Sequence, residues 1–266
     1  MGLMAKPKAT EEGKDIPKWV HDYFDRAYES HTLLTRVVGI SRKGIDGVTT
    51  MPRLSRAVAK ISGKERTPEE LAALEEEAAL ATSEVEKEFP VLHSLAVTGL
   101  WSWLEHLVKG VSAEWILHNK KALALPCFQR VRVRVGEYGT LSKREQAAHL
   151  VEALEQDVAA PLKHGVNRFE TILGSLDLSG KVKQSTADSI FELQQVRNVI
   201  AHRNGIIDRR LRVACPWLKL KVGDPIRIGV RQFQTYSAAT ADYALTVLFR
   251  LGDRHGVDLR TSPDDT

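Results

Sequence analysis

Apolar residues recur three and four positions apart along most of this chain, the spacing that places side chains on one face of an α-helix. The first such pattern begins at Trp19 and includes Tyr23, Phe24 and Ala27. Three later patterns define faces that we expect in a core: Trp101, Leu104, Leu107 and Val108; Ile190, Leu193, Val196 and Ile200; and Phe233, Tyr236, Tyr243, Val247 and Leu251. The chain is therefore predicted to be mainly all-α, an antiparallel helical bundle.

Polar residues indicate where several of these helices begin and end. Thr67 with Glu70, and Ser142 with Glu145, have the spacing of a capping box, in which each side chain accepts a hydrogen bond from the other residue's backbone amide. Residue 185 or 186 (Ser or Thr) is expected to cap the helix that carries the second apolar face. A glycine at position 205, directly after an asparagine, is expected to end it.

Two segments have the alternating pattern of an extended chain instead. "WLKLKV" and "IRIGV" flank residues 223–225 (Gly-Asp-Pro), which predicts a small β-hairpin before the last helix. "QRVRVRV" would place Arg130, Arg132 and Arg134 on one face of an extended segment. Those arginines either form a solvated edge that discourages pairing with other chains or follow a phosphate backbone, and the first is the commoner role of a short charge run.

The glycine-containing segment 39–65 lacks a continuous apolar pattern, so we expect a linker there with a short helix at residues 54–61. This divides the chain into residues 1–64 (N-terminal tail, helix and linker), 65–255 (helical bundle) and 256–266 (C-terminal tail). The first 15 residues are charged and lack an apolar core, so we do not expect a signal peptide.

Composition removes several classes of function. The net charge is only +4, so overall charge says little about a partner. The two cysteines, far apart, offer neither a disulfide framework nor a cysteine-rich zinc module, which is typical of a reducing cytoplasm. The histidines and acids show no metalloprotease or EF-hand pattern, and no apolar run reaches about 18 residues. We therefore expect no metal, no cofactor and no membrane span.

The segment "LQQVRNVIAHRNGIIDRRLR" places a strong cation and a titratable imidazole near the end of a predicted helix. Each residue turns a helix by about 100°. Asn198 and His202 are four positions apart and share a face, so Asn198 is expected to orient the imidazole. Arg197, five positions before His202, should point away from it. We therefore expect a site at the helix end, or one that two copies assemble across a twofold axis.

These residue types match cleavage of RNA without a metal. An imidazole takes up and releases a proton near neutral pH, and a guanidinium forks onto phosphate oxygens. The positive charges beside the motif, Arg203, Arg209, Arg210 and Arg212, are predicted to bind the substrate. The alternative is structural, because a histidine in the last turn of a helix, next to surface arginines, needs no function.

Arg197-Asn198, three further residues, His202 and then Gly205 resemble the signature of the HEPN superfamily of all-helical domains, in its large-bundle branch. The resemblance is sharpest over residues 185–215. It is weaker at residues 101–115, an earlier helix, and in the last helix, which ends near residue 251. It does not cover residues before about 64. It implies that Arg197 stabilises the phosphate, that His202 is the acid–base residue and that Asn198 supports the histidine. Glu105, on an earlier helix, is a weaker candidate for an acidic residue near the site, since a solvated glutamate is commoner.

The resemblance also implies a cytoplasmic, metal-independent endoribonuclease that acts on RNA and forms a homodimer through its motif helices. Such enzymes serve bacterial defence or toxin–antitoxin systems, where a cognate antitoxin or regulatory partner is expected. Two alternatives stay open at this point. One is a non-catalytic module of the same superfamily that binds RNA, a nucleotide or a protein, and the other is a dimerising scaffold whose motif only shapes an interface.

Overall fold

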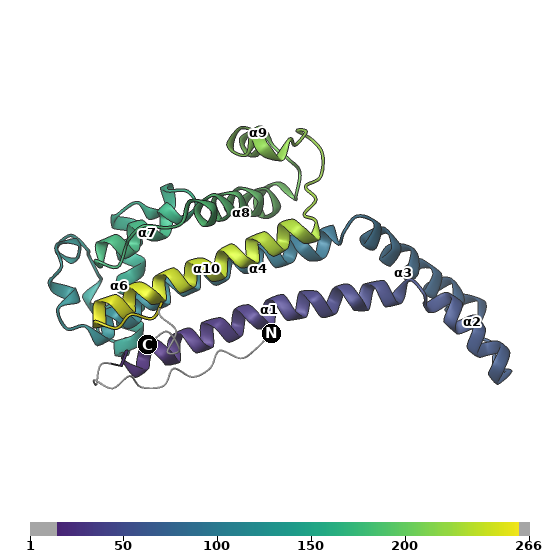
Figure 1. The fold of residues 1–266 in the computed structure, drawn as a ribbon, viewed down its shortest axis with the longest axis horizontal. Helices are drawn as coiled ribbons and strands as arrows, with labels where there is room; N and C mark the ends of the chain where they lie inside the picture. The colour runs from purple at the N-terminus through teal and green to yellow at the C-terminus, as the bar shows by residue number, and fades with distance from the viewer. Residues whose placement is uncertain (1–14, 261–266) are drawn as a thin grey trace. The chain divides into compact units, whose positions relative to one another are not determined.

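The computed structural model describes residues 15–260, so most of both predicted tails lies outside the described residues. Within this range the chain forms ten α-helices and no β-strand, which confirms the all-α class (Figure 1). The helices are α1 Lys18–Val48, α2 Met51–Ser62, α3 Pro68–Glu86, α4 Pro90–His118, α5 Val135–Tyr138, α6 Lys143–Asp157, α7 Val166–Ser175, α8 Gln184–Arg203, α9 Arg209–Ala214 and α10 Val230–His255. Four short 3₁₀ turns lie at Ala122–Ala124, Pro126–Gln129, Ala160–Leu162 and Pro216–Leu218.

Both predicted capping boxes are present. The Thr67 hydroxyl accepts from the Glu70 amide at 3.2 Å, and the Glu70 carboxylate accepts from the Thr67 amide at 3.0 Å. Ser142 and Glu145 make the same pair of bonds at the start of α6. Helix α8 begins earlier than its predicted cap at residue 185 or 186, because the amide of residue 187 already bonds the carbonyl of residue 183.

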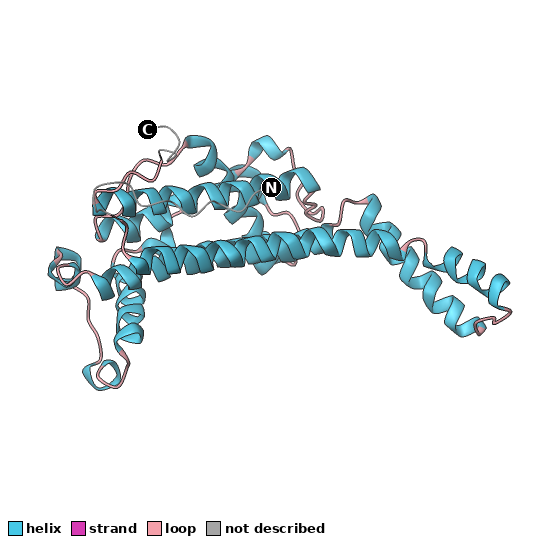
Figure 2. Cartoon of the chain, turned by 60° about the horizontal axis from the view of Figure 1, so that its bottom comes forward, coloured by secondary structure: helices cyan, strands magenta, loops and turns pink. Residues whose placement is uncertain are grey.

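The predicted linker at residues 39–65 is wrong, although the short helix predicted within it at residues 54–61 is present as part of α2. Helix α1 continues through three glycines to Val48, and α2 follows after a two-residue turn with Pro52 in its first turn. An isolated glycine costs a helix only about 1 kcal/mol, and Val38, directly before the first of these glycines, is buried at 5% exposed. Figures 1 and 2 both show α2 and α3 side by side, and the predicted boundary near residue 64 falls in the turn between them.

The predicted β-hairpin is also wrong. Its predicted turn and the start of its second half pair instead with the turn that follows α8, through an isolated bridge between Ile206 and Pro225. The amide of Ile207 donates to the Asp224 carbonyl at 2.9 Å, and the amide of Ile226 donates to the Gly205 carbonyl at 2.7 Å. The first half, "WLKLKV", starts inside the 3₁₀ turn at Pro216–Leu218, so it does not extend alongside its expected partner.

The described chain divides into two compact units. Of the described residues, the first comprises 15–30, 102–191 and 239–260, and the second comprises 31–101 and 192–238. Residues of α1, α4, α8 and α10 contribute to both. The predicted stripes on α4 and α10 are buried, with every residue at most 4% exposed, as are Ile190, Leu193 and Val196 on α8. Ile200, the last residue of the α8 stripe, is only half-buried.

In the first unit, α7 and α10 are joined through Glu170. Its carboxylate accepts from the Tyr243 hydroxyl at 2.6 Å and from Arg250 Nη1 at 2.9 and 3.1 Å. The backbone amide of Gly180 donates to the same carboxylate at 3.0 Å. The side chains of Glu170 and Arg250 are only 15% and 12% exposed, so this ion pair is largely shielded from water.

In the second unit, two histidines are buried. His93 on α4 stacks on Phe233 of α10, with ring centroids 5.2 Å apart. Its Nδ1 donates to the Ile228 carbonyl at 2.7 Å, while its Nε2 is buried without a hydrogen-bond partner. Burial lowers the pKa of His93, and burial likewise lowers the pKa of His31 on α1.

We expect the folded chain to lose stability as the pH falls below about 6.5, the usual pKa of an unfolded histidine. The unfolded chain binds protons there that buried His31 and His93 do not, so the free energy of unfolding is highest above this pH and decreases below it. Urea unfolding curves between pH 5 and 7.5 measure the effect in a window above the titration of the carboxylates. The free energy of unfolding should change less steeply with pH in His93→Phe than in the wild type. Equal slopes in both proteins would show that His93 does not cause the pH dependence.

Candidate functional site

The motif residues lie at the C-terminal end of α8, within the second unit. The helix ends at Arg203, and the next two residues adopt left-handed backbone conformations, with φ of 51° at Asn204 and 72° at Gly205. The Gly205 amide donates to the Val199 carbonyl at 3.1 Å, which occupies one of the carbonyls at the helix end. The predicted helix stop is therefore confirmed, and His202 is exposed in the last turn.

Arg197, Asn198 and His202 form one cluster, but not with the predicted contacts. Arg197 Nη1 lies 3.3 Å from His202 Nε2 and donates to Asn198 Oδ1 at 3.4 Å. Among the described residues, the Asn198 side chain contacts the arginine and not the imidazole. The prediction that Arg197 points away from His202 is wrong, because its long side chain spans the turn between the two Cα positions.

A guanidinium has five N–H donors and no acceptor, so this contact is a hydrogen bond only in the tautomer whose Nε2 accepts and whose proton is on Nδ1. In that tautomer the single lone pair of Nε2 faces Arg197 at an exposed helix end. The Nε atom of Arg197 is buried without a partner, whereas Nη1 lies at the histidine.

The predicted substrate-binding arginines follow the motif, three of them on α9. Arg209, Arg210 and Arg212 are exposed, and within residues 15–260 none of the three has an ion-pair partner. Arg203 lies 3.7 Å from Asp208, whose side chain also caps α9 by accepting from the Leu211 amide at 2.8 Å. We call Arg209, Arg210 and Arg212 the basic apron. Its free guanidinium groups can attract a polyanion.

A polar network that the sequence did not predict fixes α8 to its neighbours. The Glu192 carboxylate, on α8, accepts from Tyr236 OH at 2.7 Å and from Gln232 Nε2 at 3.0 Å, both on α10. It also accepts from the indole N–H of Trp217, in the turn after α9. Glu192 thus ties the motif helix to α10 and to the segment that follows the basic apron. The only signal in the sequence was an acid five positions before Arg197, which periodicity alone does not distinguish from a solvated glutamate.

The other candidate groups are already occupied or inert. Glu105, the weaker acidic candidate, belongs to the first unit, where it pairs with Arg168 at 2.9 Å. Both cysteines are free. Burial, with the nearby Glu192 carboxylate, raises the pKa of Cys215 to about 12, so its thiol is not a nucleophile near neutral pH.

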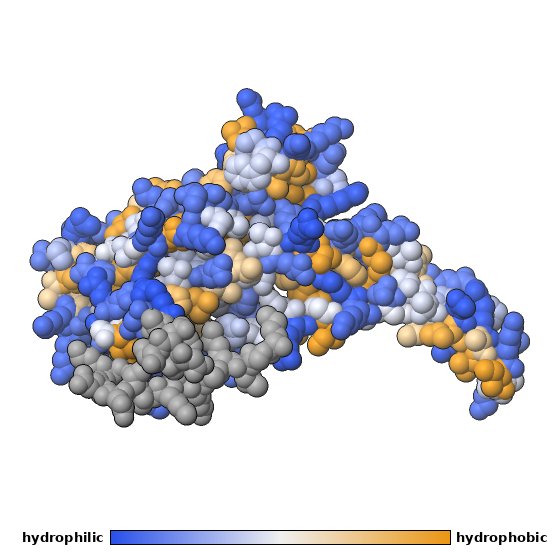
Figure 3. Space-filling model, in the orientation of Figure 1, coloured by the Kyte–Doolittle hydropathy of each residue, from blue (hydrophilic) through white to orange (hydrophobic). Residues whose placement is uncertain are grey.

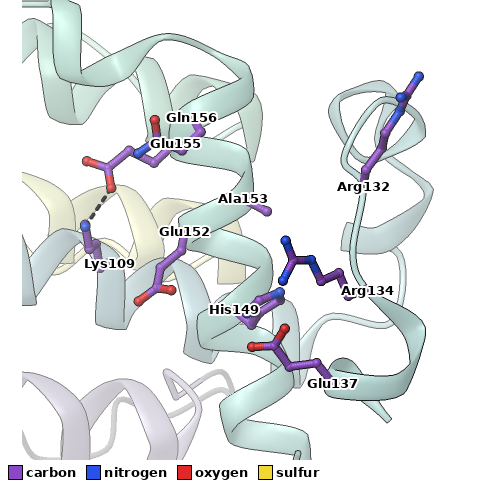
Figure 4. A pocket seen from close by; sticks show the side chains of 9 residues that line it. All are labelled: Lys109, Arg132, Arg134, Glu137, His149, Glu152, Ala153, Glu155 and Gln156. Carbon is purple, nitrogen blue, oxygen red and sulfur yellow. Dashed lines mark ion pairs between the residues drawn. The ribbon is translucent and has the colours of Figure 1, made fainter.

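The arginines of "QRVRVRV" lie outside regular structure and are all exposed. Arg130 pairs with Asp157 at 3.0 Å, as a solvated edge would. The other two border a cavity of about 540 Å³ in the first unit (Figure 4). Its lining consists of Lys109, Arg132, Arg134, Glu137, His149, Glu152, Ala153, Glu155 and Gln156. Figure 4 shows Arg134 turned toward His149 and Arg132 turned away, and three glutamates balance the cations, so the cavity does not favour a phosphate.

Comparison with known proteins gives no relative to set beside this geometry: no protein-family model, no curated protein and no solved structure matches the chain. Within the described residues, no three histidine, cysteine or acidic side chains gather in a way that could hold a metal ion. None of the helices described has the length and apolar character needed to cross a membrane.

Proposed function

We propose that the chain is a metal-independent endoribonuclease of HEPN type, with Arg197, Asn198 and His202 at its catalytic centre. The observation that carries the proposal is the contact between Arg197 Nη1 and His202 Nε2 at an exposed helix end beside the basic apron. A permanent cation and an imidazole then face the same small volume. That pair suits attack of a ribose 2′-hydroxyl on the adjacent phosphate.

In this mechanism the Arg197 guanidinium turns from His202 Nε2 to the phosphate oxygens, where negative charge develops. The single lone pair of Nε2 is then free to take the proton of the 2′-hydroxyl, whose oxygen attacks phosphorus. The bond to the 5′-oxygen breaks, and that oxygen takes up a proton from an imidazolium. The products are a 2′,3′-cyclic phosphate and a 5′-hydroxyl. Asn198 holds the guanidinium toward this volume through the 3.4 Å contact.

A second copy of the chain would complete the site. One imidazolium that has just received a proton is not ideally placed to deliver it to the opposite side of phosphorus. Two motif helices related by a twofold axis supply a second histidine for the leaving oxygen and a second arginine for the phosphate, as the HEPN resemblance implies. A cytoplasmic toxin of this kind would be controlled by a cognate antitoxin or another regulatory partner.

The second candidate is a non-catalytic module of the same type that binds RNA. It is favoured by one observation: within residues 15–260 the three guanidinium groups of the basic apron are exposed and have no ion-pair partner, so they are available to phosphates whether or not His202 acts. In that case the contact between Arg197 and His202 only stabilises the end of α8.

We expect the purified chain to cleave mixed cellular RNA in excess EDTA at the rate measured without chelator, because the reacting groups are side chains of this chain. Arg197→Ala should lose most of this activity, while Arg197→Lys retains part of it, since a point charge keeps some attraction for phosphate but loses the fork. Gel-resolved initial rates provide the measurement. Activity that disappears in EDTA and returns with Mg²⁺ or Mn²⁺ would contradict the mechanism, and RNA binding without cleavage would favour the second candidate.

A further inference from the structure

A tryptophan side chain is exposed just beyond the basic apron. Trp217 lies in the 3₁₀ turn Pro216–Leu218 and is 52% exposed, although its indole N–H donates to the Glu192 carboxylate. That nitrogen is the only polar atom of the side chain, so the surface left to solvent is the apolar ring. Tryptophan is enriched where one molecule binds another, because its large ring stacks and packs on a ligand. The exposed ring is therefore a candidate contact surface.

The anchor of this ring is rigid. The Glu192 carboxylate that accepts from the indole also accepts from Tyr236 OH at 2.7 Å and from Gln232 Nε2 at 3.0 Å. Tyr236 is only 1% exposed, so this group of polar atoms is built on the core of the second unit. A ring that is already held in place loses little conformational freedom when a ligand stacks on it, which favours binding.

The segment around Trp217 is strongly basic. Residues 209–223 include five cations and no acid. All five are exposed, and among the residues that the structure describes none has an ion-pair partner. They are the three arginines of the basic apron, Lys219 and Lys221. Figure 3 shows hydrophilic and apolar side chains mixed on the surface where Figure 1 labels α9. The partner that this charge favours is a polyanion.

This segment also leads back along α8 from the motif. At the end of α8, Arg203 lies 3.7 Å from Asp208, the residue before α9. Further along the segment, Trp217 contacts Glu192, which is ten positions before His202. Ten positions correspond to about 15 Å along a helix, and the basic apron lies in the chain between the two contacts. A strand of a few nucleotides can therefore place a phosphate at the motif, other phosphates at the apron and a base at the indole.

We propose that Trp217 is a stacking platform for an unpaired base of the bound RNA, on the strand whose phosphates the basic apron holds. An aromatic ring beside a positively charged surface is the usual arrangement for a single strand, because bases stack on the ring while the backbone follows the charges. A duplex cannot supply this base, since its bases are paired and stacked inside the helix. The stacked base sets the register of the strand relative to His202. The inference rests on the RNA-binding part of the proposed function, and it holds whether or not His202 acts.

The test is the affinity of the full-length chain for a labelled oligonucleotide of adenosine and cytidine, measured by fluorescence anisotropy at one salt concentration. This strand does not pair with itself, and 2′-O-methyl riboses remove the nucleophile, so binding is measured without cleavage. Trp217→Ala should bind about 5- to 150-fold more weakly, the range for one lost stacked base. Trp217→Phe should retain most of the affinity, and Trp217→Leu should resemble Trp217→Ala. All three variants lose the bond to Glu192, and only phenylalanine keeps an aromatic face.

Two other probes separate stacking from a structural role of the tryptophan. Heparin, a polyanion without bases, should bind Trp217→Ala as tightly as the wild type, because the basic apron is unchanged. The same oligonucleotide annealed to its complement should also bind both proteins equally. Arg209→Ala/Arg212→Ala is the contrasting variant: it should weaken the binding of all three probes, since it removes charges that hold phosphates.

Equal affinity of the wild type and Trp217→Ala for the single strand would overturn the proposal. An equal loss of affinity for heparin would also overturn it, because Trp217 would then only hold the basic apron in place. Single-strand binding that depends on Trp217, in a chain that cleaves no RNA, would support the stacking platform and reject the endoribonuclease. Cleavage of RNA at the wild-type rate by a Trp217→Ala variant with unchanged affinity would reject the platform and keep the endoribonuclease.

Discussion

Replacing His202 with alanine should reduce RNA cleavage about a hundred- to ten-thousand-fold, the usual contribution of general acid–base catalysis. The same substitution should change the free energy of unfolding by about 1 kcal/mol or less, because only dipole and capping contributions at a helix end are lost. The imidazole is exposed, and its neighbour Arg197 keeps Asn198 as a hydrogen-bond partner when the histidine is removed. The two effects are of such different size that cleavage rates and melting curves on one protein sample separate them.

Asn198→Ala is the matched control for this prediction. It removes a polar side chain one position from Arg197 and keeps the arginine and the histidine, so its loss of activity should be much smaller than that of His202→Ala. If His202→Ala unfolds the chain or cleaves as fast as the wild type, the histidine is structural. In that case the second candidate, RNA binding without cleavage, would replace the proposed function.

Glu170→Ala should lower the free energy of unfolding by about 3 kcal/mol or more, the scale for removing one partner of a shielded ion pair. The substitution leaves the Arg250 guanidinium, 12% exposed, with only backbone carbonyls as acceptors. It also removes the acceptor of the Tyr243 hydroxyl, which is fully buried at the core of the first unit. Glu170→Gln should cost less than Glu170→Ala, since an amide oxygen still accepts from Tyr243.

Asp22→Ala provides the contrast. Asp22 pairs with Lys18 on the exposed surface of α1, four positions away, and the lysine side chain is 85% exposed. Water and salt screen such a pair, so this substitution should change stability far less than Glu170→Ala. Urea unfolding of both variants measures the difference. Equal losses of stability would show that burial of the Glu170–Arg250 pair does not matter.

The helical class could be predicted because periodicity reports which face of a helix is buried. The stripes on α4 and α10 are buried as expected, and the Thr67 and Ser142 capping boxes are formed. The glycines of α1 misled the prediction, because local propensity overestimated the cost of a glycine in a long packed helix. The predicted hairpin was wrong because alternation predicts an extended segment but does not identify the segment that it pairs with. Here that partner is the turn at residues 205–207.

The candidate site was predictable in its residues and less so in its contacts. Residue spacing on a helix describes Cα positions, and it correctly placed His202 in the last turn of α8. It did not predict that the Arg197 side chain reaches His202, because the conformation of a long side chain is set by local packing. Glu192 and Trp217 are 25 residues apart in the sequence, and only tertiary structure brings them together.

The chemistry of the RNA ends tests the central claim most directly. Fragments produced by the wild-type chain in EDTA should carry 2′,3′-cyclic phosphate or, after ring opening, 3′-phosphate at one terminus and 5′-hydroxyl at the other, as read by mass spectrometry. These ends require the 2′-hydroxyl as nucleophile, which is the group that His202 deprotonates in the proposed mechanism. Fragments with 3′-hydroxyl and 5′-phosphate ends would show that water attacked phosphorus and would contradict the account, as would intact RNA at every enzyme concentration.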